Sequence, residues 1–178
     1  METVTFYSYK GGVGRTTLLA QCARELARQG ARVVAVDFDL DAPGLHYRLR
    51  PESGEVTRGA VDLIDDYLTQ GSLYASLDDA TYLARTGAPL SGGWVRVLPA
   101  GAAPSASYWD QLSRIVWRAF LYAPDATGPT FLQDLLEQLR VQYDPDLVLI
   151  DSRTGITELS HAALSLLADR VVCVLVDN

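Results

Sequence analysis

Residues 10–17 read Lys10-Gly11-Gly12-Val13-Gly14-Arg15-Thr16-Thr17, and this stretch decides the fold. It follows the apolar run 4–7 and opens into a helix-forming run from Leu18 to Gln29. Three glycines in four positions let the backbone curl until successive N–H groups point at one anion. The helix that follows adds unpaired N–H groups and the positive end of its dipole. A strand, a glycine-rich loop and a helix in this order are typical of a P-loop, which binds phosphate groups.

Two positions depart from the usual P-loop pattern G-x-x-x-x-G-K-[ST]. Tyr9 stands at the first glycine position, and Arg15 stands where a lysine is usual. Lysine places a compact charge between the β- and γ-phosphates, whereas arginine is a wide planar fork. Thr16 occupies the position whose hydroxyl binds Mg²⁺, and Thr17 can reach the α-phosphate. The stretch predicts a nucleotide bound with Mg²⁺ and a turnover at or below about 1 s⁻¹.

The order Lys-Gly-Gly-x-Gly-x-Thr-Thr resembles the deviant Walker A loop of the ParA/MinD ATPases. In that family a signature lysine stands early in the loop, and Lys10 matches it. The arginine variant, Lys-Gly-Gly-Val-Gly-Arg, is similar to a branch found beside effector proteins in bacterial conflict systems. The resemblance implies that residues 10–17 bind ATP and that Arg15 takes part in catalysis. It also implies a homodimer in which Lys10 reaches the nucleotide of the partner subunit.

A second segment follows the apolar run 32–36 and reads Asp37-Phe38-Asp39-Leu40-Asp41-Ala42-Pro43-Gly44. Strand alternation places Asp37 and Asp39 on one side, at the carboxyl end of a parallel strand, where open α/β sheets bind ligands. In the resembled family the later aspartate, here Asp39, positions the water that attacks the γ-phosphate. We therefore expect Asp37 and Asp39 beside the metal. The alternative is that aspartates before Pro-Gly only form a turn.

A third segment reads Leu147-Val148-Leu149-Ile150-Asp151-Ser152-Arg153-Thr154-Gly155. Four apolar residues that end in an aspartate match the Walker B pattern, and its carboxylate, here Asp151, binds Mg²⁺ directly or through water. Residues Ser152, Arg153, Thr154 and Gly155 resemble the switch segment of the family, in which proline is common where Arg153 stands. Arg153 either stabilises transition-state charge or forms a local ion pair with Asp151 or Glu158.

Composition limits the class of protein. The chain has 178 residues, 48% of them hydrophobic, and we expect one domain over residues 1–178. Its net charge of −7 argues against a general affinity for nucleic acid, and no apolar run approaches membrane-spanning length. Cys22 and Cys173 lie in expected helix and strand interiors, which predicts buried reduced thiols and a cytoplasmic location. We assign no chemistry to His46 or His161.

Helix and strand patterns alternate along the chain and predict an α/β fold, a mostly parallel sheet with helices on both faces. The pattern predicts one helix at Ser107–Tyr122, with an aromatic stripe that packs in the core or forms a partner surface, and another at Thr157–Ala168. Residues 86–93 are expected to form a loop. Members of the resembled family usually continue past the last strand, so we expect the C-terminal part of that fold to be missing. At least five strands are expected, at Thr3–Ser8, Arg32–Asp37, Trp94–Leu98, Leu147–Asp151 and Arg170–Val176.

Together these segments predict an Mg·ATP-binding ATPase that converts ATP and water to ADP and phosphate. It would act as a nucleotide-dependent dimeric switch and regulate an effector protein. One alternative is an ATP-sensing interaction module that hardly hydrolyses its nucleotide. Another is a phosphotransferase, because bacterial tyrosine kinases and small-molecule kinases share this loop. Tyrosine kinases of that type usually have a tyrosine-rich tail, which is not found in this sequence.

Overall fold

The computed structural model describes residues 1–52, 56–71, 77, 84–85 and 92–176. Its centre is a sheet with the strand order β3-β4-β2-β5-β1-β6. All neighbouring strands are parallel except β3 and β4, which are antiparallel. The predicted α/β fold is confirmed, because its five parallel strands are those expected from the sequence. The strands are β1 (Glu2–Tyr7), β2 (Arg32–Phe38), β3 (Ala84–Arg85), β4 (Trp94–Leu98), β5 (Leu147–Ser152) and β6 (Arg170–Cys173).

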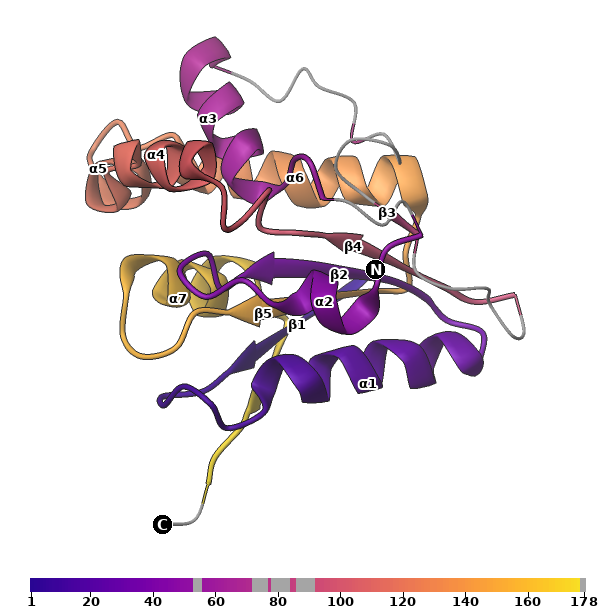
Figure 1. Ribbon diagram of the computed structural model, residues 1–178. Helices are drawn as coiled ribbons and strands as arrows, with labels where there is room; N and C mark the ends of the chain where they lie inside the picture. The colour runs from indigo at the N-terminus through magenta and orange to yellow at the C-terminus, as the bar shows by residue number, and fades with distance from the viewer. Residues whose placement is uncertain (53–55, 72–76, 78–83, 86–91, 177–178) are drawn as a thin grey trace.

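Helices cover both faces of the sheet (Figure 1). On one face lie α1 (Arg15–Arg28) and the short α2 (Leu45–Leu49), which share an apolar cluster with the sheet. The helices of the opposite face pack in a second and larger cluster. They are α3 (Ala60–Gln70), α4 (Ala106–Arg114), α5 (Trp117–Tyr122), α6 (Gly128–Tyr143), α7 (Glu158–Ala162) and the π-helical turn η1 (Ala163–Leu167).

Alternate side chains of β2 pack on opposite faces of the sheet. Val33 and Ala35 pack in the cluster of α1, whereas Val34 and Val36 pack in the cluster of the opposite face. Successive side chains of a strand point to opposite faces, so a continuous apolar run is required where both faces are covered. This burial on both faces fixes β2 and its neighbour β5 at the centre of the sheet.

The prediction of one helix over Ser107–Tyr122 is wrong, because the structure has two helices there, α4 and α5. The backbone between them leaves the helical region at Ile115 (φ −75°, ψ 108°), next to Val116. Adjacent β-branched residues have low helix propensity. In addition, Ile115 and Phe120 are both buried in the core. They are five residues apart, so a continuous helix would place their side chains about 140° apart around its axis. The break lets both side chains reach the same core.

The predicted aromatic stripe is therefore only partly buried. Tyr108, Leu112, Ile115 and Phe120 lie in the core, whereas Trp109 and Val116 are exposed. The helix expected over Thr157–Ala168 is present as α7, capped by the Thr157 hydroxyl, and continues as η1.

The two cysteines are less buried than the sequence predicts. Cys173 is exposed and Cys22 is half-buried, so the prediction of two buried thiols is wrong. Cys173 ends β6, which pairs only with β1 among the described strands, so one side of that strand is uncovered.

Of the loop predicted at residues 86–93, positions 86–91 lie outside the described residues.

Candidate functional site

Three predicted segments meet at one edge of the sheet. The strands β2, β5 and β1 are neighbours and parallel, so their carboxyl ends lie side by side. A cavity of about 360 Å³ opens at this edge, and we call it the P-loop cavity. Its lining residues are Ser8, Gly11, Gly12, Val13, Gly14, Arg15, Thr16, Thr17, Asp39, Ala42, Gly44, Arg48 and Thr154. The structure thus brings together the P-loop, the segment 37–44, which we call the acidic turn, and the switch segment 152–155.

The conformation of the loop depends on two of its glycines. Gly12 (φ 75°) and Gly14 (φ 88°) are in the left-handed region, which glycine adopts without strain. A Cβ atom built on either residue would meet no atom within 4 Å, so the backbone angle and not packing requires glycine. Gly14 is also the residue from which α1 begins, and the first N–H groups of a helix have no acceptor within it. These donors lie at the cavity wall.

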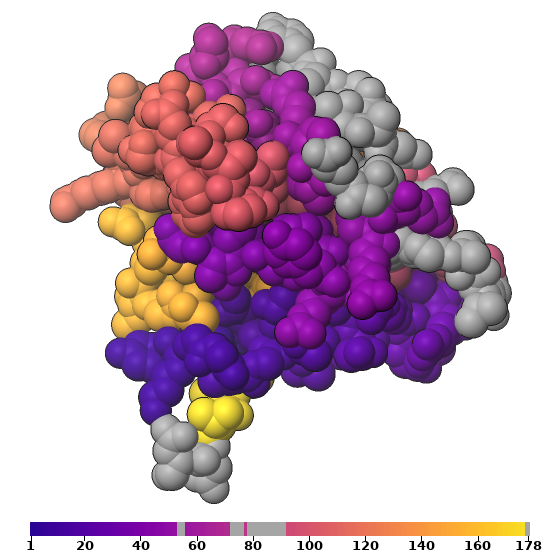
Figure 2. All heavy atoms as spheres, in the orientation of Figure 1, coloured from indigo at the N-terminus to yellow at the C-terminus, as the bar shows by residue number. Residues whose placement is uncertain are grey.

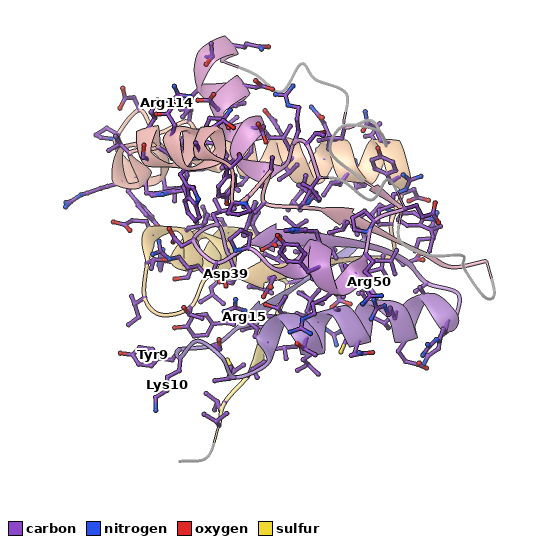
Figure 3. The ribbon with its side chains drawn as sticks, viewed as in Figure 1. Tyr9, Lys10, Arg15, Asp39, Arg50 and Arg114 are labelled. Atoms are coloured by element: carbon purple, nitrogen blue, oxygen red, sulfur yellow. The ribbon has the colours of Figure 1, made fainter. Side chains whose placement is uncertain are left out.

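The side chain of Arg15 is almost fully buried, at 4% exposure. Its Nε donates to Asp151 Oδ1 at 2.5 Å and its Nη2 donates to Asp39 Oδ2 at 2.7 Å. Nη1 donates to the Ser8 hydroxyl at 3.1 Å. Figure 3 shows Arg15 and Asp39 close to each other between the sheet and the start of α1. One guanidinium therefore joins the carboxylate that follows β2 to the carboxylate at the end of β5.

Asp151 lies at the end of β5 and is completely buried. Burial raises the pKa of its carboxyl, whereas the charge of Arg15 and a hydrogen bond from the Thr16 hydroxyl lower it. Its second oxygen, Oδ2, is buried without a hydrogen-bond partner. A carboxylate with a free oxygen beside a threonine hydroxyl is a pair of hard oxygen donors that suits Mg²⁺.

Among the described residues, no group of three or more His, Cys, Asp or Glu side chains could hold a metal by itself. Mg²⁺ is usually bound by one or two carboxylates together with phosphate oxygens and water. Asp151 and Thr16 would supply the protein ligands, with Asp39 nearby, and a nucleotide would supply the rest.

Asp37 does not line the cavity. Its Oδ1 accepts from the N–H of Asp39 at 3.2 Å, and its Oδ2 accepts from the N–H groups of Gly44 and Leu45 at 3.1 and 3.0 Å. Burial, together with the charge of Asp151, raises its pKa to about 8. The carboxyl group therefore holds the acidic turn in shape, and no described contact directs it to a metal.

Replacing Asp37 by alanine is expected to lower the free energy of unfolding by about 2–4 kcal/mol, because three N–H groups would lose their acceptor. Asp41→Ala is the matched control, since Asp41 belongs to the same turn and loses only an exposed ion pair, with Arg153, which contributes little stability. Chemical denaturation of both variants measures the difference. Equal stabilities would show that Asp37 does not hold the turn.

The switch segment is joined to the acidic turn. Arg153 Nε lies 2.6 Å from Asp41 Oδ2, so the predicted ion pair of Arg153 with Asp151 or Glu158 is wrong and Asp41 is the partner. Thr154 lines the cavity, and Ser152 is buried at the end of β5. Gly155 (φ 73°) donates its N–H to the Ser8 carbonyl. The ion pair therefore joins the switch segment to the acidic turn, and the hydrogen bond joins it to the residue before the P-loop.

Lys10 lies apart from this network. Figure 3 shows Lys10 and Tyr9 at the tip of the loop, directed away from Arg15 and Asp39. Both side chains are exposed, and Lys10 is the only lysine in the sequence. Within the described part of the chain it has no ion pair. The structure therefore leaves Lys10 able to contact another molecule.

Sequence reasoning missed two residues of the site, Ser8 and Arg48. Ser8 is the last residue before the loop and binds Arg15, a role that no sequence pattern marks. Arg48 lies on α2, which follows the acidic turn directly, so a basic residue there could have been considered.

Comparison with known proteins gives the family. The family model of the CobQ/CobB/MinD/ParA nucleotide-binding domain matches residues 4–172. The chain belongs to this family. Over 62 residues it is 42% identical to the septum site-determining protein MinD of Helicobacter pylori. These 62 residues are 35% of this chain and 23% of that protein. An iron-sulfur cluster carrier protein of Pseudomonas fragi is 28% identical over 164 residues, or 86% of this chain and 53% of the relative.

Solved structures show the same fold. MinD from Pyrococcus horikoshii, complexed with Mg-ADP, superposes with a TM-score of 0.63 at 25% identity and covers 97% of this chain and 57% of its own. Cobyrinic acid a,c-diamide synthase from Mycobacterium smegmatis, with bound ADP and magnesium, has a TM-score of 0.66 at 22% identity and coverages of 98% and 60%. The chain thus spans only part of these proteins. Within the described residues, no helix has the length and apolar character needed to cross a membrane.

Proposed function

We propose that this nucleotide-binding domain binds Mg·ATP in the P-loop cavity and acts as a slowly hydrolysing, nucleotide-dependent dimeric switch. One observation carries the proposal: residues 11–17 and Asp39 line a single cavity at the carboxyl ends of three adjacent strands, and Asp151 is buried behind its wall, where it binds Arg15. The Mg-ADP complex of MinD from Pyrococcus horikoshii supports the choice of ligand. ATP is proposed over GTP from the family alone.

The residues of the cavity have separate roles in this proposal. The N–H groups of the loop and of the first turn of α1 bind the phosphates, helped by the helix dipole. Thr16 and Asp151 would hold Mg²⁺, which neutralises phosphate charge when bound. Asp39 would orient the attacking water. Burial raises the pKa of Asp39 and favours its action as a base, whereas the ion pair with Arg15 opposes that effect.

Slow hydrolysis follows from the position of Arg15. The guanidinium binds both Asp39 and Asp151, so Mg²⁺ and the attacking water would have to share these carboxylates with it. A carboxylate paired with arginine is a weaker base than a free one. The same pair favours the second candidate function, an ATP-sensing interaction module that hardly hydrolyses. An effector protein as partner is proposed from the resemblance to the arginine-variant branch.

Replacing Thr16 by alanine is expected to weaken Mg²⁺-dependent ATP binding by about 10–100-fold, the usual loss when a metal site is disturbed. Thr69→Ala is the matched control, because Thr69 is exposed on α3 and bonds only its own helix. The measurement is the rise in melting temperature with ATP, with and without Mg²⁺. Equal rises for both variants would remove Thr16 from the site.

A further inference from the structure

A second cavity of about 330 Å³ lies beside the P-loop cavity, between α1 and α2. We call it the arginine pocket. It shares Thr17 and Arg48 with the P-loop cavity, so the two are contiguous. In Figure 2 the first residues of the chain (indigo) and the α2 region (purple) adjoin on one face of the molecule. Its described lining residues are Thr17, Ala20, Gln21, Arg24, Tyr47, Arg48 and Arg50.

The pocket concentrates positive charge in a chain whose net charge is −7. Three of the seven described lining residues are arginines, and none of those seven is a carboxylate. Several other arginines on the surface pair with acids, as Arg28 pairs with Glu25 and Arg32 with Asp144 and Asp146. By contrast, Arg24, Arg48 and Arg50 form no ion pair with any residue that the structure describes. Their charges are therefore available to an anion.

The backbone at Arg50 indicates that its side chain has a role. Arg50 ends α2 with φ 53° and ψ 82°, and its N–H donates to the His46 carbonyl. This is the left-handed position after a helix at which glycine is most favourable. An arginine there is strained relative to glycine. Figure 3 shows Arg50 over α1, on the far side of the cavities from Lys10.

The pocket is also held in shape by contacts of its own. Arg24 of α1 donates from Nη2 to the carbonyl oxygen of Arg48, which joins the two helices. The side chains of Leu45 and Leu49 anchor α2 in the core beneath. The exposed ring of Tyr47 lies beside the arginines and contacts the ring of His46, with ring centroids 3.9 Å apart and the planes tilted by 45°. The pocket therefore combines cations with an aromatic surface on two helices that a hydrogen bond joins.

We infer that the arginine pocket binds a phosphate group additional to those in the P-loop cavity. Arginine binds phosphate with paired, charge-assisted hydrogen bonds, and three arginines without acid partners match a doubly charged anion. The inference deepens the proposed function and rests on it for the neighbouring nucleotide. The pocket begins at Thr17, the loop residue nearest the α-phosphate. The phosphate therefore belongs either to the sugar of that nucleotide or to a separate phosphorylated molecule.

A simpler role for the arginines would be to balance the negative end of α2. Arg50→Gly separates the two roles, because glycine suits the backbone and removes the charge. If the arginine served only the helix, this variant would keep its phosphate binding. Of the two described cavities, Arg24 and Arg50 line only the arginine pocket, so their variants remove no side chain that lines the P-loop cavity.

The test is a calorimetric titration of the chain, saturated with Mg·ADP, with inorganic pyrophosphate. Saturation is verified first by thermal shift, so failure of nucleotide binding is detected separately. We expect pyrophosphate to bind and Arg24→Ala and Arg50→Gly each to weaken it about tenfold, the effect of one charge-assisted hydrogen bond. Arg118→Ala is the control, because Arg118 is exposed on α5 and carries the same charge. It should leave the affinity unchanged.

A second arm compares ADP with adenosine 3′-phosphate 5′-diphosphate. Tighter binding of the latter, lost in Arg50→Gly, would place the phosphate on the nucleotide. Binding of pyrophosphate beside ADP without such an advantage would place it on a separate molecule. The inference is overturned if neither probe binds more tightly to the unmodified chain than to the Arg24→Ala and Arg50→Gly variants. If Mg·ADP does not bind, the affinities of the unmodified chain, Arg24→Ala and Arg50→Gly for pyrophosphate still decide whether the arginine pocket binds phosphate.

Discussion

Replacing Arg15 by alanine is expected to lower the free energy of unfolding by about 3–5 kcal/mol, the usual effect of breaking a buried ion pair. The variant would leave Asp39 and Asp151 as neighbouring buried carboxylates without their shared cation. Nucleotide binding should be lost as well, since the cation that would remain among the lining residues, Arg48, is exposed on α2 and not buried at the base of the loop. Urea denaturation followed by ATP titration measures both effects.

Two variants make this result specific to the buried pair. Arg28→Ala removes an arginine from the same helix, but its partner Glu25 is exposed, so little change is expected. Arg15→Lys keeps the charge and should retain part of the stability, although one ammonium cannot replace all three contacts of the guanidinium. A stable Arg15→Ala protein with unchanged ATP affinity would show that Arg15 is not central to the site.

Replacing Lys10 by alanine is expected to weaken an ATP-bound dimer by about 10²-fold or more. A charge-assisted hydrogen bond contributes about 1.5–3 kcal/mol, and a symmetric dimer would lose it twice. Lys10 is exposed, directed away from its own cavity and the only lysine, so no other lysine can take its place. Light scattering is to be measured with ATP in an Asp39→Ala background, in which we expect hydrolysis to be blocked.

The same measurement includes its controls. ADP in place of ATP should give mostly monomer, because the γ-phosphate is the proposed partner of Lys10. Arg118→Ala removes one positive charge elsewhere on the surface and should leave the dimer intact. A dimer that forms equally with ADP and without Lys10 would remove the switch mechanism. The ATP-sensing module would then be the better description.

The fold could be predicted from the sequence because its signals are local. Apolar runs such as Val33–Val36 predict strands buried on both faces, and the glycines before Arg15 mark where a strand ends and a helix begins. Parallel strands place their carboxyl ends together, so the meeting of the loop, Asp39 and Asp151 followed from topology.

What could not be predicted depends on tertiary contacts. The direction of the Arg15 side chain is set by Asp39, Asp151 and Ser8, which come from three different segments. Arg153 pairs with Asp41 and not with a sequence neighbour, because the loops after β2 and β5 lie side by side.

The break at Ile115 has the same kind of origin. It depends on which residues the core can receive, and helical periodicity carries no such information.

The most direct test of nucleotide binding by this site is a calorimetric titration of the chain with ATP, with and without Mg²⁺, followed by analysis of the products. The account predicts one nucleotide per chain, tighter binding with Mg²⁺, and release of ADP and phosphate at or below about 1 s⁻¹. Absence of binding under both conditions, or binding that ignores Mg²⁺ and Thr16→Ala, would contradict it.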